Sequence, residues 1–145
     1  MTKRFFITGA NSGFGFAIAK AAVAQGHSVI GAVRSDAALS HVRAELPAVQ
    51  PVRLDVTDFD NIPNVIAQAE DDFGPIDVLI NNAGYGHEGV LEESPMDELR
   101  RQFEVNVFGA TAVAKAFLPR FRERRVGFIV NITSMGGMIT MPGIA

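Results

Sequence analysis

Short apolar runs and longer amphipathic segments alternate along the whole chain. The apolar runs lie at residues 4–8, 28–33, 50–54, 77–81 and 127–133, and segments with helical spacing separate them. Short strands that alternate with helices are typical of βαβ units and a parallel sheet. The pattern therefore predicts an α/β protein with a doubly wound parallel sheet.

Glycine, serine and proline mark the ends of the first two predicted helices. A helix over residues 16–25 is expected to stop at Gly26, because glycine is favoured just past a helix end. The next helix is expected to start near Ser35 or Asp36, with Asp36 as its cap, and to end before Pro47.

The third and fourth helices have similar signals. Residues 57–60, Thr-Asp-Phe-Asp, match a capping box for the third helix, and residues 74–75, Gly-Pro, would end it. A long fourth helix is expected to open with Ser94 as N-cap and Pro95 as first helical residue, and to end within residues 120–125.

A proline sets the order of the strands. Pro51 lies in the third predicted strand, and a residue without an N–H group belongs on an edge strand or at a strand start. With right-handed crossovers, this favours the strand order 3-2-1-4-5. We expect this Rossmann-like sheet to form a single domain over residues 1–145.

Composition narrows the class of protein. The chain of 145 residues is 48% hydrophobic, has a formal net charge of −3 and contains no cysteine. The charge gives no electrostatic footprint for a nucleic acid, and the lack of cysteine excludes disulfides and thiolate zinc sites. No segment reaches the ~18 apolar residues of a membrane span, and the histidines lack metal-ligand spacing. We expect a cytoplasmic protein with a small-molecule substrate and no metal site.

Polar or glycine-rich groups follow every predicted strand. Residues 9–15 follow the first strand, Arg34 the second and Asp55 the third, while residues 81–84 and 133–134 end the fourth and fifth. Ligands bind at the carboxyl ends of strands in open α/β sheets. The glycine segment also opens a helix, whose free N–H groups favour an anion. These groups predict a phosphate-containing ligand at this edge.

Together these residues resemble the short-chain dehydrogenase/reductases of the classical type. The resemblance rests on Thr8-Gly9-x-x-x-Gly13-x-Gly15, Asn81-Asn82-Ala83-Gly84, Asn106 and Ser134. The glycine spacing fits the classical type better than the extended, epimerase-like type. The resemblance implies hydride transfer between a nicotinamide cofactor and an alcohol or carbonyl, in a protein that is a homo-oligomer at full length.

The family pattern also implies which residues hold the dinucleotide. The diphosphate loop would consist of Gly9, Asn11, Ser12, Gly13, Phe14 and Gly15. The third glycine also allows close packing of helix on strand, so that Gly15 would serve both purposes. Asp55 and Val56 would flank the adenine, and Asn82, Ala83 and Gly84 would line the adenosine ribose. Two structural alternatives stay open: Asp55 as a turn carboxylate, and Asn81 or Asn82 as a brace of the fourth strand.

Arg34 indicates which dinucleotide is bound. An acid about 20 residues after the glycines bonds the ribose 2′-hydroxyl of NAD, whereas an arginine there accommodates the 2′-phosphate of NADP. Val33 occupies the position of the acid, and Arg34 follows it. We therefore expect NADP, with NAD as the alternative that Asp36 would favour.

Two further residues would serve the reaction itself. The resemblance implies that Asn106 bends the fourth helix and holds a water of a proton relay. It implies that Ser134 hydrogen-bonds the substrate oxygen and stabilises charge in the transition state.

The family chemistry also needs a Tyr-x-x-x-Lys pair, which this sequence lacks. Its only tyrosine is Tyr85, which Gly89 follows four residues later, and its last lysine is Lys115. We expect a domain that is incomplete at its C-terminus, without its last strands, and a chain that is inactive on its own. A non-catalytic dinucleotide-binding module or sensor is the alternative function.

Overall fold

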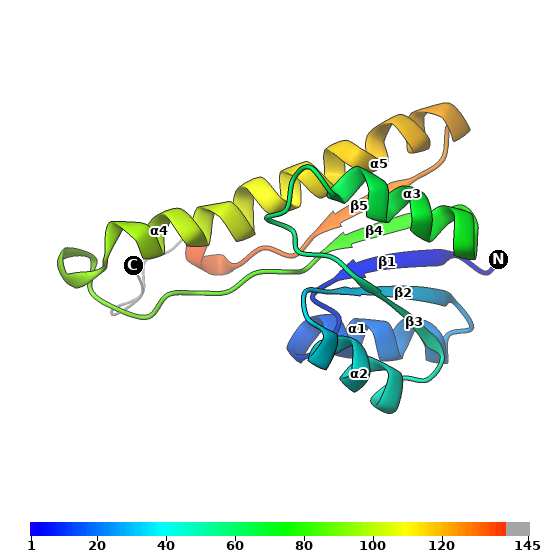
Figure 1. Cartoon of the computed structure of the whole chain (residues 1–145), viewed down its shortest axis with the longest axis horizontal. Helices are drawn as coiled ribbons and strands as arrows, with labels where there is room; N and C mark the ends of the chain where they lie inside the picture. The colour runs from blue at the N-terminus through cyan, green and yellow to red at the C-terminus, as the bar shows by residue number, and fades with distance from the viewer. Residues whose placement is uncertain (139–145) are drawn as a thin grey trace.

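The computed structural model describes residues 1–138. Within them, all strands run parallel in one sheet of order β3-β2-β1-β4-β5, as predicted (Figure 1). The strands are β1 (Arg4–Thr8), β2 (Ser28–Val33), β3 (Val49–Arg53), β4 (Val78–Asn81) and β5 (Phe128–Asn131). The strand with Pro51 lies at an edge, where a missing N–H group does not interrupt the ladder.

Helices cover both faces of the sheet, so that the fold is doubly wound. The α-helices are α1 (Gly13–Ala24), α2 (Asp36–Glu45), α3 (Ile62–Phe73), α4 (Met96–Phe103) and α5 (Ala110–Arg124). A π-helical segment, η2 (Glu104–Gly109), joins α4 to α5, and the 3₁₀ turns are η1 (Leu91–Glu93) and η3 (Met135–Gly137). Figure 1 shows α1 and α2 on one face, and α3 and α5 on the other.

The central strand β1 supplies both halves of the core. Phe6 belongs to the cluster under α3 and α5, whereas its neighbour Ile7 belongs to the cluster under α1 and α2. Both side chains are fully buried, because neighbouring residues of a strand point to opposite faces. Phe6 also meets the Phe117 ring edge-on at a centroid distance of 5.3 Å, which fixes α5 against the sheet.

The predicted ends of α1 before Gly26 and of α2 before Pro47 are confirmed, whereas the start of α1 and the cap of α2 differ from the prediction. Gly26 ends α1 with a φ of 80°. The N–H groups of Gly26 and His27 bond the carbonyls of Val23 and Ala22, which is a Schellman motif. However, α1 begins at Gly13 rather than at residue 16, because the glycine loop itself forms the first turn.

The cap of α2 differs from the prediction. Ser35 is its N-cap, and the Ser35 hydroxyl accepts the Ala38 N–H at 3.2 Å. Asp36 is therefore not the cap: it lies in the first turn, exposed, and pairs with Arg53 at 3.4 Å.

The predicted capping box at residues 57–60 was wrong. These residues form turns, in which the N–H of Asn61 bonds the Asp58 carbonyl, and α3 starts only at Ile62. The Thr57 hydroxyl does not cap the helix, because it is bonded to the Asp55 carboxylate at 2.7 Å.

The start of α4 also differs from the prediction by one residue. Pro95 is the extended N-cap rather than the first helical residue. Ser94 ends the η1 turn, and its hydroxyl donates to the Val90 carbonyl instead of capping α4. The predicted long helix is confirmed as the run α4–η2–α5 and ends at Arg124. Among the described residues, no helix has both the length and the apolar character needed to cross a membrane.

Candidate nucleotide-binding site

A cavity of about 620 Å³ lies at the carboxyl ends of β1, β2, β3 and β4. It is lined by eleven of the twelve residues predicted to bind the dinucleotide: Gly9, Asn11, Ser12, Gly13, Phe14, Arg34, Asp55, Val56, Asn82, Ala83 and Gly84. Four segments that are distant in sequence thus meet at one place. Its volume is within the range of ordinary small-molecule and cofactor pockets.

The glycine loop presents free backbone donors to this cavity. Gly9 and Gly13 have φ values of 68° and 53°, which other residues adopt only with strain. The first backbone bond of α1 joins the N–H of Phe16 to the Ser12 carbonyl, and the Ser12 side chain makes no cap bond. Within residues 1–138, the N–H groups before Phe16 in this turn have no protein acceptor. A helix N-terminus of this kind binds phosphate.

Gly15 does not line the cavity but packs behind it. A Cβ atom there would collide with the Asn82 side-chain amide and with the Gly9 carbonyl oxygen. Gly15 therefore allows α1 to approach the end of β4, which is the packing role that sequence reasoning gave it.

Thr8 and Asn82 tie the loop to the end of β4. The Thr8 hydroxyl accepts the N–H groups of Asn82 and Ala83 at 3.0 and 2.9 Å. The Asn82 amide donates to the Thr8 and Gly9 carbonyls at 2.9 and 3.2 Å. Asn81 braces a different place, since its amide donates to the Ala110 carbonyl and the Asn131 side chain. The bracing interpretation of both asparagines is thus confirmed, and Asn82 lines the cavity as well.

The charged residues at the ends of β2 and β3 differ in their surroundings. Arg34 and Val33 both line the cavity, and Arg34 is exposed whereas Val33 is mostly buried. Asp36 is absent from the cavity wall. Asp55 lines the cavity, but one of its carboxylate oxygens is held by the Thr57 N–H and hydroxyl at 2.9 and 2.7 Å. The turn interpretation of Asp55 is therefore correct for that oxygen.

The surroundings of Asp55 favour its ionised form. Partial burial on its own would raise the pKa of Asp55. The hydrogen bonds from Thr57 and the guanidinium groups of Arg34 and Arg101 outweigh this effect, and the pKa is lowered from its ordinary value of 3.8.

Asn106 fixes the loop that follows β4. It lies in the π-helical η2, where its side-chain oxygen accepts the Tyr85 N–H at 3.0 Å and its amide donates to the Tyr85 carbonyl at 2.7 Å. π-helical segments occur frequently at functional sites, and this one interrupts the long helix at the predicted residue. The proton-relay role of Asn106 remains a prediction.

Ser134 follows β5 and does not line the cavity. Its side chain is exposed, and its hydroxyl accepts the Gly136 N–H at 3.1 Å as the N-cap of η3. Within residues 1–138 this hydroxyl donates to no protein acceptor, so it can donate to a ligand oxygen. No group of acidic, histidine or cysteine side chains that could hold a metal ion exists among the described residues.

Sequence reasoning missed one wall of the cavity. Glu98, Arg101 and Val105 line it from α4 and η2. Thr8 was also missed as a brace. A buried threonine at the end of an apolar strand was the available signal for Thr8, but helical periodicity alone gave none for the α4 residues.

Comparison with known proteins agrees with this geometry. The family model described as short chain dehydrogenase matches residues 3–145. An oxidoreductase from Botryotinia fuckeliana is 40% identical over 147 residues, which cover 100% of this chain and 54% of that protein.

Solved structures of short-chain dehydrogenases and of a ketoreductase have the same fold as this chain. A short-chain dehydrogenase from Streptomyces avermitilis matches with a TM-score of 0.89 and 45% identity, over 98% of this chain and 52% of that one. An actinorhodin polyketide ketoreductase variant with NADPH matches with a TM-score of 0.91 and 30% identity, over 98% of this chain and 57% of that one. The chain spans about half the length of the curated relatives it matches. On this family match and the parallel sheet of order 3-2-1-4-5, the chain belongs to the short-chain dehydrogenase family.

Proposed function

We propose that these residues form the dinucleotide-binding half of an NADP-dependent oxidoreductase that acts on an alcohol or carbonyl compound. The observation that supports this most directly is the cavity at the carboxyl ends of the strands. It combines a helix N-terminus that has free N–H groups with Arg34 directly after β2. The ketoreductase with NADPH has the same fold at 30% identity.

Some residues of this chain would bind the nucleotide, and others would position the substrate and the loop beside the cavity. The N–H groups at the start of α1 would receive the diphosphate, and Arg34 would pair with the 2′-phosphate of NADP. Bound NADPH would supply the hydride. Ser134 would donate its free hydroxyl hydrogen to the substrate oxygen, and Asn106 would keep the Tyr85 loop in place beside the cavity.

Proton transfer to the substrate oxygen needs a group that this sequence does not contain. A tyrosine has an ordinary pKa near 10, and a neighbouring lysine would be needed to lower it for work at neutral pH. Tyr85 has no such lysine, and both burial and the Glu98 carboxylate raise the pKa of Tyr85 above 10.0. We therefore expect the 145-residue chain to bind NADPH without reducing a carbonyl compound.

Nucleotide binding tests the first part of the proposal. Isothermal titration of the 145-residue chain should give an affinity for NADPH at least about tenfold higher than for NADH, which is ~1.4 kcal/mol. Arg34→Ala should weaken this preference and leave NADH binding unchanged. Arg53→Ala is the matched control, since Arg53 is an exposed arginine at the carboxyl end of β3 but outside the cavity. Equal binding of both nucleotides by the parent chain would refute the NADP assignment.

A non-catalytic nucleotide sensor is the alternative function. The coding sequence beyond Ala145 distinguishes the two. An enzyme requires the Tyr-x-x-x-Lys segment to follow, whereas a stop codon directly after Ala145 would support the sensor. For the enzyme we also propose a homo-oligomer in the cytoplasm, which size-exclusion chromatography and cell fractionation would test.

A further inference from the structure

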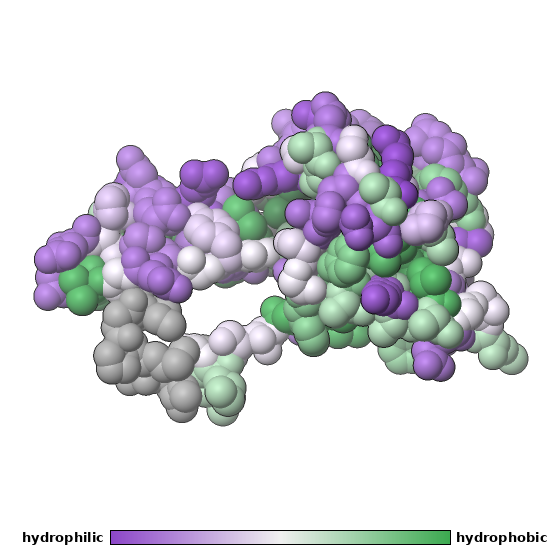
Figure 2. Space-filling view, turned by 90° about the horizontal axis from the view of Figure 1, so that it is seen from below, coloured by the Kyte–Doolittle hydropathy of each residue, from purple (hydrophilic) through white to green (hydrophobic). Residues whose placement is uncertain are grey.

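Helix α4 forms a second wall of the nucleotide cavity, opposite the strand ends. Glu98, Arg101 and Val105 line the cavity and follow one another at intervals of three and four residues, so they occupy one face of the helical run. Figure 1 shows α4 beyond the carboxyl ends of the strands, and Figure 2 shows this end of the molecule standing away from the main body with a mostly hydrophilic surface. A charged side chain of α4 can thus reach a ligand that also contacts the sheet edge.

The two neighbouring arginines of α4 have different surroundings. Arg100 pairs with Asp97 at 2.8 Å on the exposed side of the helix, with 69% and 93% of the two side chains accessible to solvent. Arg101 lines the cavity and takes part in none of the ion pairs of residues 1–138. The helix therefore presents one guanidinium group to solvent and the other to the cavity.

Arg101 and Arg34 both line the cavity, the one from α4 and the other from the end of β2. Both guanidinium groups favour the ionised form of Asp55 and both also influence Tyr85, although they come from α4 and from the end of β2. Asp55 cannot form a full bidentate pair with either arginine, because Thr57 occupies one of its oxygens. The cavity wall thus combines the guanidinium groups of Arg34 and Arg101 with the carboxylates of Asp55 and Glu98, and neither of these arginines forms an ion pair within residues 1–138.

We propose that Arg101 is a second specificity-determining residue for the ribose phosphate of the nucleotide, and that it binds this phosphate from α4 while Arg34 binds it from the sheet. This inference rests on the proposed function. A phosphate monoester has a charge of about −1.5 to −2 near neutral pH and three acceptor oxygens, so that one arginine neutralises only part of it. The planar fork of a guanidinium group suits bidentate contact with phosphate oxygens, which two arginines on opposite walls can each make.

Two small nucleotides separate a phosphate contact from other effects. Adenosine 2′,5′-bisphosphate contains the distinguishing phosphate, and 5′-AMP is the same molecule without it. Isothermal titration should show that Arg101→Ala weakens the bisphosphate about tenfold, ~1.4 kcal/mol, and changes 5′-AMP less than about twofold. Arg101→Lys should have an intermediate effect, since it keeps the charge but loses the fork.

The control variant is Arg100→Ala, which removes the same charge from the adjacent residue of the same helix. It should leave both affinities unchanged, because Arg100 does not line the cavity. Circular dichroism and thermal unfolding of each variant would establish that the fold is retained. Arg101 and Arg100 are both exposed, so we expect neither variant to unfold.

The outcomes distinguish this inference from the function on which it rests. If Arg34→Ala weakens the bisphosphate and Arg101→Ala does not, Arg101 plays no part and the NADP assignment survives. If Arg101→Ala weakens both nucleotides equally, Arg101 contacts the adenosine instead and the inference is wrong. If the parent chain binds the bisphosphate no better than 5′-AMP, both the inference and the NADP assignment fail.

Discussion

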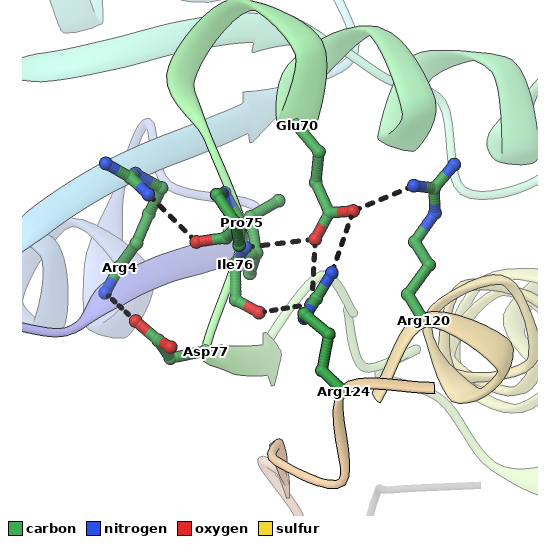
Figure 3. Close-up of polar contacts among 7 residues, drawn as sticks. All are labelled: Arg4, Glu70, Pro75, Ile76, Asp77, Arg120 and Arg124. Atoms are coloured by element: carbon green, nitrogen blue, oxygen red, sulfur yellow. Dashed lines mark hydrogen bonds and ion pairs between the residues drawn. The ribbon is translucent and has the colours of Figure 1, made fainter. Parts of the chain in front are cut away.

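Replacing Glu70 by glutamine should destabilise the fold through an ion-pair cluster far from the cavity. The Glu70 side chain is only 7% exposed and joins α3 to α5 (Figure 3). Its oxygens accept hydrogen bonds from Arg120 at 2.8 Å, Arg124 at 2.9 Å and the Ile76 N–H at 2.9 Å. Arg124 also donates to the Ile76 carbonyl at 2.8 Å, so that the cluster fixes the start of β4 as well.

The size of the loss follows from the burial of the partners. Breaking a fully buried ion pair costs about 3–5 kcal/mol, because the remaining charge stays desolvated. Arg120 and Arg124 are 34% and 30% exposed, so solvent screens part of this cost. Glutamine also keeps an acceptor for the Ile76 N–H. We therefore expect Glu70→Gln to lower the free energy of unfolding by about 2 kcal/mol, or the melting temperature by roughly 4–8 °C.

The pH dependence of this loss tests its electrostatic origin. Burial alone would raise the pKa of Glu70, but hydrogen bonds from Arg124, Ile76 and Arg120 outweigh burial and lower the pKa below 4.5. A carboxyl group with a lowered folded-state pKa stabilises the fold above its unfolded pKa, and this contribution is lost as the pH falls through the folded value. The difference between parent and variant should thus be full at about pH 7 and shrink progressively below about pH 4.5.

Urea denaturation at several pH values measures both quantities. Asp97→Asn is the matched control, because this carboxylate also pairs with an arginine but is 93% exposed, and we expect it to change stability by less than about 0.5 kcal/mol. A Glu70→Gln variant within about 0.5 kcal/mol of the parent, or a loss of equal size at neutral and acidic pH, would refute the reasoning.

Three further substitutions test the geometry around the cavity. Gly109→Ala should cost about 1–3 kcal/mol in urea denaturation, because its Cβ would lie 2.9 Å from a Val56 methyl group; a stable variant would show that η2 and the loop after β3 can move apart. Thr8→Val should cost about 2 kcal/mol and weaken NADPH binding, since two N–H groups lose their acceptor, whereas Thr111→Val, at an exposed hydroxyl, should be nearly neutral; similar losses for both would contradict the bracing role. Ser134→Ala should leave NADPH affinity in titration unchanged, because Ser134 does not line the cavity, and a large loss would place it in nucleotide binding instead.

The sequence was sufficient for the features that depend on local chemistry. The strands β1 and β2 were predicted with their observed bounds, because buried parallel strands are continuous apolar runs between clear turn signals. The edge position of β3 followed from Pro51 alone. Eleven of the residues predicted to bind the dinucleotide line one cavity, because a parallel sheet brings the carboxyl ends of its strands together. This holds for any side chains that follow the strands.

The two wrong helix caps are polar side chains that had more than one possible hydrogen-bond partner. Thr57 and Ser94 both look like helix caps in the sequence, yet Thr57 bonds Asp55 and Ser94 bonds the Val90 carbonyl. A capping motif shows which hydrogen bonds a side chain can make with the first turn of a helix. A nearby carboxylate or carbonyl competes with that turn for the same hydroxyl group. The cavity wall formed by α4 was missed for another reason. Arg100 and Arg101 are adjacent arginines that the sequence cannot tell apart, and only the position of the helix against the cavity shows which of them lines it.

The position of α4 depends on the π-helical segment that precedes α5. Helix α5 is firmly packed, with Val113, Phe117 and Phe121 in the core, whereas α4 has no buried residue. The cavity wall formed by α4 is therefore not held by its own hydrophobic core. It is placed by η2, in which Asn106 bonds both backbone groups of Tyr85 and Gly109 packs closely on Val56. The position of α4 and of its charged side chains against the cavity thus also depends on Asn106, to which the family resemblance assigned a catalytic role.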